Sequence, residues 1–154
     1  MPRHSAGLLL YRGAGAAVEV LIVHPGGPFW ARKDDGAWSI PKGEYTGDED
    51  PWAAARREFA EEVGVPAPDG ARLDLGSVTQ AGGKVVTVFA VAGDLDVQAA
   101  YSNTFELEWP PRSGTMREFP EVDRVEWFAV EQARVKLLAG QRPFLDRLLA
   151  HSGR

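Results

Sequence analysis

The chain has 154 residues, a formal charge of −5 and no cysteine. This length suits one domain with a single core, and the lack of cysteine excludes a disulfide scaffold, a cysteine-liganded zinc site and a thiol nucleophile. The acidic balance argues against a general nucleic-acid-binding surface. No long apolar run and no secretory start are present, so neither a membrane span nor export is expected. We therefore expect a single cytoplasmic domain over 1–154.

The N-terminal part carries two apolar segments, which predict strands at 6–11 and 18–24. The second segment is apolar at both sets of alternating positions, so we expect it to be buried on at least one face and favour burial on both. A loop rich in Gly, Pro and aromatic residues follows at 25–36, and a short strand is predicted at 37–40.

The C-terminal part predicts further strands at 85–91, 104–109 and 124–128, and a helical region at 130–150 that Gly140 interrupts. No internal repeat and no linker long enough to separate domains is present in the sequence. The pattern indicates one α/β domain with a mixed sheet.

A helix is predicted over 51–63, because Asp50 can cap it, Pro51 suits its first position and Gly64 suits the residue after its end. At 100° per residue, an apolar stripe should face the core and a patch of three carboxylates should lie to one side of it. The expected stripe is Trp52, Phe59 and Val63, with Arg56 at its edge, and the carboxylates are Glu58, Glu61 and Glu62.

The acidic charge is concentrated around this helix. Residues 43–65 hold seven acids and two bases, while the rest of the chain holds 15 of each, so the segment carries the whole excess. Glu58 and Glu62 repel each other at i,i+4, and hard divalent cations favour such oxygen clusters. The alternative is a solvated acidic helix face on which Arg57 pairs with Glu61.

Residues 43–65 read GEYTGDEDPWAAARREFAEEVGV, which resembles the Nudix box at all nine of its specified positions. Phe59 is bulkier than the usual aliphatic residue there. The resemblance implies a Nudix-type α/β/α sandwich with a mixed β-sheet and the catalytic helix at 51–63. It also implies a MutT-like, Mg²⁺-dependent hydrolase, with Mn²⁺ as a substitute, that cleaves a diphosphate linkage in a nucleoside diphosphate attached to another group.

The same resemblance implies roles for the residues of the box. Glu58 and Glu62 would be the principal metal ligands, and Glu61 and the carbonyl of Lys42 would be further ligands. Arg57 and Glu49 would hold Glu58 in place by hydrogen bonds. Gly43 would let the loop approach the helix, and Gly64 would end the helix.

The general base lies outside the box in many family members. Residues 119–127 resemble the corresponding region of bacterial RNA pyrophosphohydrolases, which favours Glu121 as a fourth carboxylate. Glu118, Glu106 and Glu108 compete with it, and each of these acids could instead be an ordinary surface residue. The predicted catalytic residues are therefore Arg57, Glu61, Glu62 and Glu121.

Aromatic and basic residues precede the box and predict a substrate surface. Trp30 or Trp38 could stack on the nucleobase of a substrate, although packing in the core is the alternative for each. Arg32, Lys33 or Lys42 could contact phosphates, and Lys42 is favoured because it directly precedes the box. The three histidines, His4, His24 and His151, show no metal-ligand spacing, so no role is expected for them.

Nucleoside triphosphates and dinucleoside polyphosphates are the predicted substrates, and 5′-triphosphate RNA ends are an alternative. Glu44 stands where hydrolases of dinucleoside polyphosphates often have His, so the box does not select that subclass. A non-catalytic module that senses nucleotides or binds proteins is the alternative of another class, but such members usually lose box glutamates. We expect a small-molecule nucleotide partner, no membrane, and a monomer or homodimer.

Overall fold

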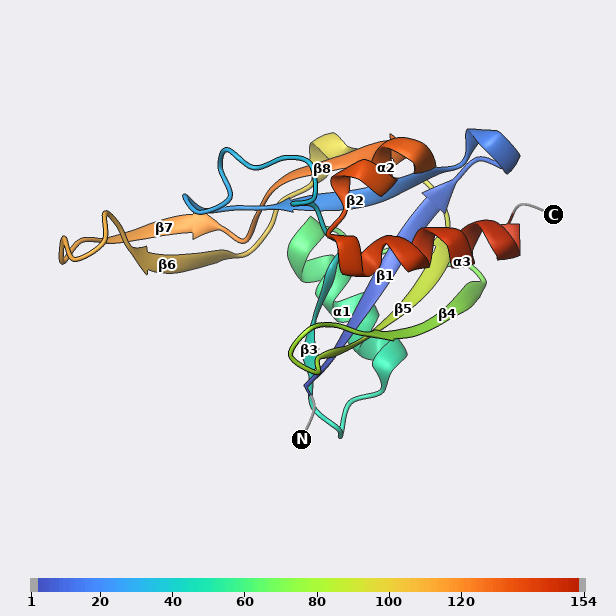
Figure 1. Ribbon diagram of the computed structural model, residues 1–154, viewed down its shortest axis with the longest axis horizontal. Coiled ribbons are helices and arrows are strands. Elements are labelled where there is room, and N and C mark those ends of the chain that lie inside the picture. Colours follow the sequence, from blue (N-terminus) through green and yellow to red (C-terminus); the bar gives the residue numbers. More distant parts are fainter. Residues whose placement is uncertain (1–2, 153–154) are drawn as a thin grey trace.

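The computed structural model describes residues 3–152 and centres on strand β1, His4–Arg12 (Figure 1). The run from Ser5 to Leu10 is buried without interruption, as expected of a strand covered on both faces. β1 pairs in parallel with β5, Val85–Ala92, and antiparallel with β2, Glu19–Pro25. The mixed sheet predicted from the sequence is confirmed.

The main sheet has six strands. Five follow the order β4-β5-β1-β2-β8, and β3 pairs antiparallel with the first half of β1. The outer strands are β4, Arg72–Thr79, and β8, Val122–Ala129, and β3 spans Lys42–Tyr45. This arrangement places the end of β2, the start of β8 and β3 at one side of the molecule (Figure 1).

Helices cover both faces of the sheet and make three layers. Helix α1, Pro51–Val63, packs with Leu8, Leu10 and Leu21 on one face. Helices α2, Val130–Lys136, and α3, Arg142–Ser152, pack on the other face. Short 3-10 turns occur at Gly15–Ala17, Val97–Ala99 and Ala139–Gln141. The α/β/α sandwich is therefore confirmed, and within 3–152 no helix is long and apolar enough to cross a membrane.

A second, two-stranded sheet projects from the body as a hairpin of β6, Thr104–Glu108, and β7, Met116–Pro120 (Figure 1). Phe105 faces Phe119 across the two strands. The loop after β2 packs against the hairpin, because Phe29 meets Trp109 edge-on at a ring separation of 5.5 Å. The hairpin and this loop thus form one arm beside the end of the sheet.

Most predicted elements lie where the sequence places them. The helix predicted at 51–63 has those bounds, and the helical region at 130–150 is interrupted near Gly140. The strand predicted at 37–40 is wrong: residues 38 and 39 form only isolated bridges, to Leu137 and Val23 respectively. The strand lies later, at β3, and the sequence patterns also missed β4 and β7.

Candidate active site

Helix α1 begins and ends through its own sequence. The Asp50 side chain accepts a hydrogen bond from the Ala53 N–H at 3.0 Å, and Pro51 occupies the first turn. Gly64 ends the helix with φ +87°, and a β-carbon there would also overlap the Tyr101 carbonyl. Gly64 therefore has a packing role besides ending the helix.

The core face of α1 differs slightly from the predicted stripe. Phe59 and Val63 are fully buried as expected, whereas Trp52 is half-buried and meets Phe89 edge-on. Arg56 is exposed, 3.3 Å from Asp69. Ala54 and Ala55 complete the buried face. The small alanines let the helix approach the sheet, so the glutamates beside them lie close to β3.

Glu58 lies directly against the backbone of β3. A β-carbon built on Gly43 would overlap the Glu58 carboxylate, and only 13% of the Glu58 side chain is exposed. Arg57 donates from one terminal nitrogen to Glu58 Oε2 at 2.7 Å. The carboxylate is therefore fixed between a glycine and a guanidinium.

Arg57 joins Glu58 to the loop before the helix. Its Nε and second terminal nitrogen donate to the two oxygens of Glu49, both at 2.8 Å, in the paired geometry that guanidinium groups form with carboxylates. These bonds raise the pKa of Arg57 and lower that of Glu49. A weaker contact of 3.5 Å reaches Glu61. Arg57 thus lies between Glu49 and Glu58, while Glu61 is at the margin of the network.

Glu62 points from α1 toward β3 and the start of β8. Its Oε1 accepts a hydrogen bond from the Lys42 N–H at 3.4 Å. Burial raises the pKa of Glu62 to about 8, and the charges of Glu58 and Glu121 act in the same direction, while Lys42 opposes them. Burial, reinforced by Glu61, also raises the pKa of Glu58. Both carboxylates therefore lie where their ionised forms need more positive charge than the protein supplies.

This donor set suits a hard divalent cation. Glu58 and Glu62 offer oxygen atoms, and a bound cation would favour the charged forms that burial disfavours. Within 3–152, no three acidic or histidine side chains form a closed metal-binding group by themselves. Mg²⁺ commonly takes one or two protein carboxylates and completes its coordination with water and substrate phosphates. The residues present therefore fit Mg²⁺ in that mode.

A cavity of about 220 Å³ opens beside Glu62. It brings together four of the predicted site residues, from the loop after β2, from β3, from α1 and from the residue before β8. These are Trp30, Lys42, Glu62 and Glu121, and the wall is completed by Val23, Pro25, Ala37, Ser39, Val122 and Leu138. Apolar walls around a few convergent polar groups are typical of small-molecule sites.

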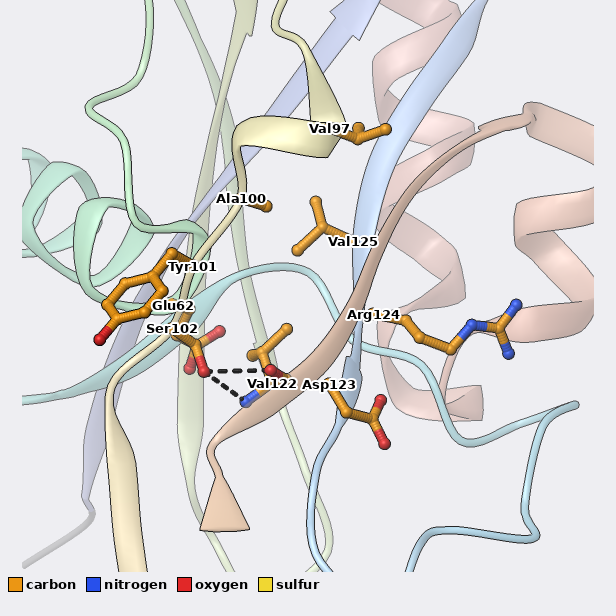
Figure 2. A pocket seen from close by; sticks show the side chains of 9 residues that line it. All are labelled: Glu62, Val97, Ala100, Tyr101, Ser102, Val122, Asp123, Arg124 and Val125. Carbon is orange, nitrogen blue, oxygen red and sulfur yellow. Dashed lines mark hydrogen bonds between the residues drawn. The ribbon is translucent and has the colours of Figure 1, made fainter.

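Glu62 also lines a smaller cavity of about 140 Å³ between the loop at 97–102 and the start of β8 (Figure 2). There the Ser102 hydroxyl donates to the Val122 carbonyl at 3.0 Å and accepts from the Val122 N–H at 3.1 Å. This pair fixes the start of β8 next to Glu62.

Among the candidate bases, Glu121 is the one that lines the larger cavity. Its N–H donates to the Asn103 carbonyl at 2.8 Å, and its carbonyl accepts from the Gly26 N–H at 2.9 Å, so its backbone is held from both sides. The other three carboxylates lie on the β6–β7 hairpin, outside the residues that line either cavity. They are Glu106, Glu108 and Glu118.

The predicted substrate surface is changed in two places. Trp38 is completely buried, with its indole N–H donating to Asp34 at 2.7 Å and its ring packed edge-on against Phe128. Trp38 therefore has no free ring face on which a nucleobase could stack, and its role is packing in the core. Arg32 is exposed and does not line the larger cavity. Trp30 is half-buried, with the Lys33 ammonium 5.1 Å from its ring.

Two buried polar residues that the sequence patterns did not select bond to segments next to the larger cavity. Gln141 is fully buried; its side-chain oxygen accepts from the Ile40 N–H at 2.8 Å, and its amide donates to the Ser39 hydroxyl at 3.0 Å. His24 is also buried and contacts both Asp123 and Lys33. A polar residue inside an apolar strand pattern, as at His24, is the signal that could have identified it.

Comparison with known proteins gives one match to a family: the model described as NUDIX domain matches residues 1–148. No curated protein matches the sequence. Among the solved structures that share the fold, three at low sequence identity illustrate the match. The NUDIX domain of Shewanella oneidensis NrtR complexed with ADP ribose has a TM-score of 0.66 at 17% identity, covering 98% of this chain and 88% of that one. A C. elegans Ap4A hydrolase binary complex has a TM-score of 0.63 at 20% identity, and the match covers 96% of each chain. A mutT/nudix family protein from Listeria innocua has a TM-score of 0.62 at 15% identity, and the match covers 98% of this chain and 94% of that one.

Proposed function

Because the chain belongs to the NUDIX family of pyrophosphohydrolases, we propose that it is a Mg²⁺-dependent enzyme that cleaves the diphosphate linkage of nucleoside diphosphate derivatives. One observation carries the proposal. Lys42, Glu62 and Glu121 line a single cavity, and Glu58 is fixed beside it against Gly43. The groups that we propose to hold the cation, contact the phosphate and act as the base would therefore share one space, as hydrolysis of a phosphoanhydride requires.

In this proposal Glu58 and Glu62 hold Mg²⁺ from adjacent turns of α1, and Mn²⁺ can substitute. Glu61 and the Lys42 carbonyl are further ligands. When bound, the ion neutralises charge on the phosphate oxygens and polarises the bond that breaks. Arg57, paired with Glu49, keeps the Glu58 carboxylate in one orientation.

Glu121 acts as the general base. It accepts a proton from a water molecule as the water oxygen bonds to phosphorus and the bridging phosphorus–oxygen bond breaks, so that the leaving phosphate carries away the electron pair. The Lys42 ammonium contacts a phosphate of the substrate at the same cavity. Trp30 packs against the nucleobase or the sugar of the nucleotide.

The substrates we propose are dinucleoside polyphosphates and nucleoside triphosphates, and 5′-triphosphate RNA ends are an alternative class. The fold shared with the C. elegans Ap4A hydrolase and with the ADP-ribose complex of NrtR supports a nucleotide with a second group beyond its diphosphate. We also propose a cytoplasmic location and a monomeric or homodimeric state, as expected from the sequence. Size-exclusion chromatography tests the oligomeric state.

The test is chromatographic detection of the cleavage products (nucleotides, and any phosphate or pyrophosphate) from a panel of these nucleotides, with and without Mg²⁺. Mg²⁺-dependent turnover of at least one supports the proposal, and the best substrate names the subclass. Tight nucleotide binding with no turnover of any diphosphate would instead support the nucleotide-sensing module.

A further inference from the structure

A buried histidine near the end of β2 joins both sides of the larger cavity. The exposed fraction of His24 is 3%. Its Nε2 lies 2.6 Å from the Lys33 carbonyl, and because a carbonyl only accepts, Nε2–H is the donor. Its Nδ1 lies 2.7 Å from Asp123 Oδ1, within hydrogen-bond distance. Each ring nitrogen is therefore bonded to a different segment of the chain.

Asp123 faces His24 because the ladder between β2 and β8 shifts there. His24 pairs with Arg124, whereas the next residue, Pro25, pairs with Val122, so Asp123 is an extra residue in β8. Such bulges re-aim a side chain and are common beside active sites. In Figure 2 the Asp123 carboxylate points away from Glu62. The bulge thus turns Asp123 toward His24, while Glu121 lines the larger cavity.

Both bonding partners of His24 adjoin the cavity wall. The Lys33 N–H donates to the Trp30 carbonyl at 3.0 Å, so the carbonyl that His24 holds belongs to the turn that carries Trp30. Asp123 follows Glu121 by two residues, and the intervening Val122 lines the cavity. His24 itself does not line the cavity. The hydrogen bonds of His24 therefore reach the cavity through these two segments, and its ring also packs edge-on against Trp38 at 5.3 Å.

We propose that His24 is a positioning residue with two separable functions: Nδ1, through Asp123, fixes the general base Glu121, and Nε2, through Lys33, fixes the Trp30 turn that receives the nucleotide. This inference rests on the proposed function, which supplies the roles of Glu121 and Trp30. A displacement of about 1 Å in a group that aligns reactants can cost a hundredfold in rate. A short bond from a buried ring is a direct way to prevent such a displacement.

Two substitutions separate the functions, because each amide reproduces one ring nitrogen. His24→Asn places its amide near Nδ1 and keeps the Asp123 contact but not the Lys33 contact. We expect it to raise KM about fivefold or more with kcat within about twofold. His24→Gln reaches the Lys33 carbonyl but not Asp123. We expect it to lower kcat about fivefold or more with KM within about twofold.

Three further variants complete the test. Asp123→Asn keeps a hydrogen-bonding group opposite Nδ1 and should retain most of the kcat that Asp123→Ala loses. Leu145→Ala, on the buried face of α3 and outside the residues that line the cavity, lowers stability and should leave both kcat and KM near wild type below its melting temperature. If both His24 variants change kcat and KM together, or neither changes them, the positioning role is wrong.

Hydrogen exchange gives a readout independent of turnover. His24→Asn should raise exchange at residues 26–36, and His24→Gln should raise it at 119–123, each leaving the other segment protected. A wild-type enzyme without turnover on the nucleotide panel but with this exchange pattern would overturn the proposed function alone. Active wild-type enzyme with unchanged exchange in both variants would overturn the role of His24 alone.

Discussion

The Glu58 carboxylate lies so close to the α-carbon of Gly43 that no side chain fits between them. Gly43, the first residue of the box, and Glu58 of α1 are thus in direct contact, 15 positions apart. The contact explains why a short strand, β3, lies immediately beside the acidic helix. It also sets a strict steric condition on any metal site built from Glu58.

Gly43→Ala tests this condition. The new methyl group would displace the Glu58 carboxylate, so we expect kcat to fall about a hundredfold with only a small change in the free energy of unfolding. Gly47→Ala is the matched control, because a β-carbon at Gly47 meets no atom within 4 Å. Normal Mg²⁺-dependent turnover in Gly43→Ala would show that the position of Glu58 is not required.

Arg57 should affect the reaction only through the carboxylates that it holds. Arg57→Lys keeps the charge but loses the paired bonds to Glu49, so we expect Mg²⁺ affinity or kcat to fall about 10- to 100-fold. Arg56→Lys changes the neighbouring, exposed arginine and should remain within about twofold of wild type. Titration of activity against Mg²⁺ concentration measures both, and equal behaviour of the two variants would contradict the assignment.

The stability of the metal-free protein should fall as pH rises. The pKa of Glu62 is raised to about 8 in the fold by burial, above its ordinary value of 4.5. Between these values the unfolded chain loses a proton that the folded chain keeps, so Glu62 stabilises the fold fully below pH 4.5 and progressively less up to pH 8.

Denaturant unfolding in a chelator at pH 5, 6.5 and 8 measures this effect. Glu62→Gln removes the titrating group and should flatten the decline, and added Mg²⁺ should restore wild-type stability at pH 8. An equal pH dependence in wild type and Glu62→Gln would exclude Glu62 as its source.

The two tryptophans near the box should behave oppositely. Trp38→Ala removes a fully buried side chain and should cost about 3–5 kcal/mol of the free energy of unfolding. Trp30→Ala should leave that free energy nearly unchanged and raise KM for the nucleotide. A normal KM in Trp30→Ala would remove Trp30 from the substrate surface.

Local signals explain what the sequence could predict. Asp50, Pro51 and Gly64 mark the ends of α1 by capping chemistry alone, and the spacing of Glu58 and Glu62 on that helix places both carboxylates on one side. These features need no partner elsewhere in the chain. The bounds of the helix and the position of the acidic patch can therefore be predicted from the sequence without knowledge of the fold.

Long-range pairing determines the rest. β3 is four residues long, carries Lys42, Gly43 and Glu44, and is a strand because it meets β1, nearly 40 residues away. β4 has mostly exposed or half-buried residues and is interrupted by Gly76 with φ +76°, so no clear alternation marks it.

Burial of individual aromatic and polar side chains is equally non-local. Trp38 is enclosed through a bridge to Leu137, 99 residues later, and no local pattern distinguishes it from Trp30. The contact between His24 and Asp123 depends on a bulge in β8 that only the pairing with β2 produces.

We propose that the glutamates of α1 form a catalytic Mg²⁺ site, and nucleotide hydrolysis by wild type, Glu58→Gln and Glu62→Gln across a Mg²⁺ titration tests this assignment directly. We expect wild type to turn over with Mg²⁺ and not with chelator, and each variant to lose about a hundredfold or more while its circular dichroism and melting temperature show an intact fold. Near-normal Mg²⁺-dependent turnover in both variants would contradict the claim.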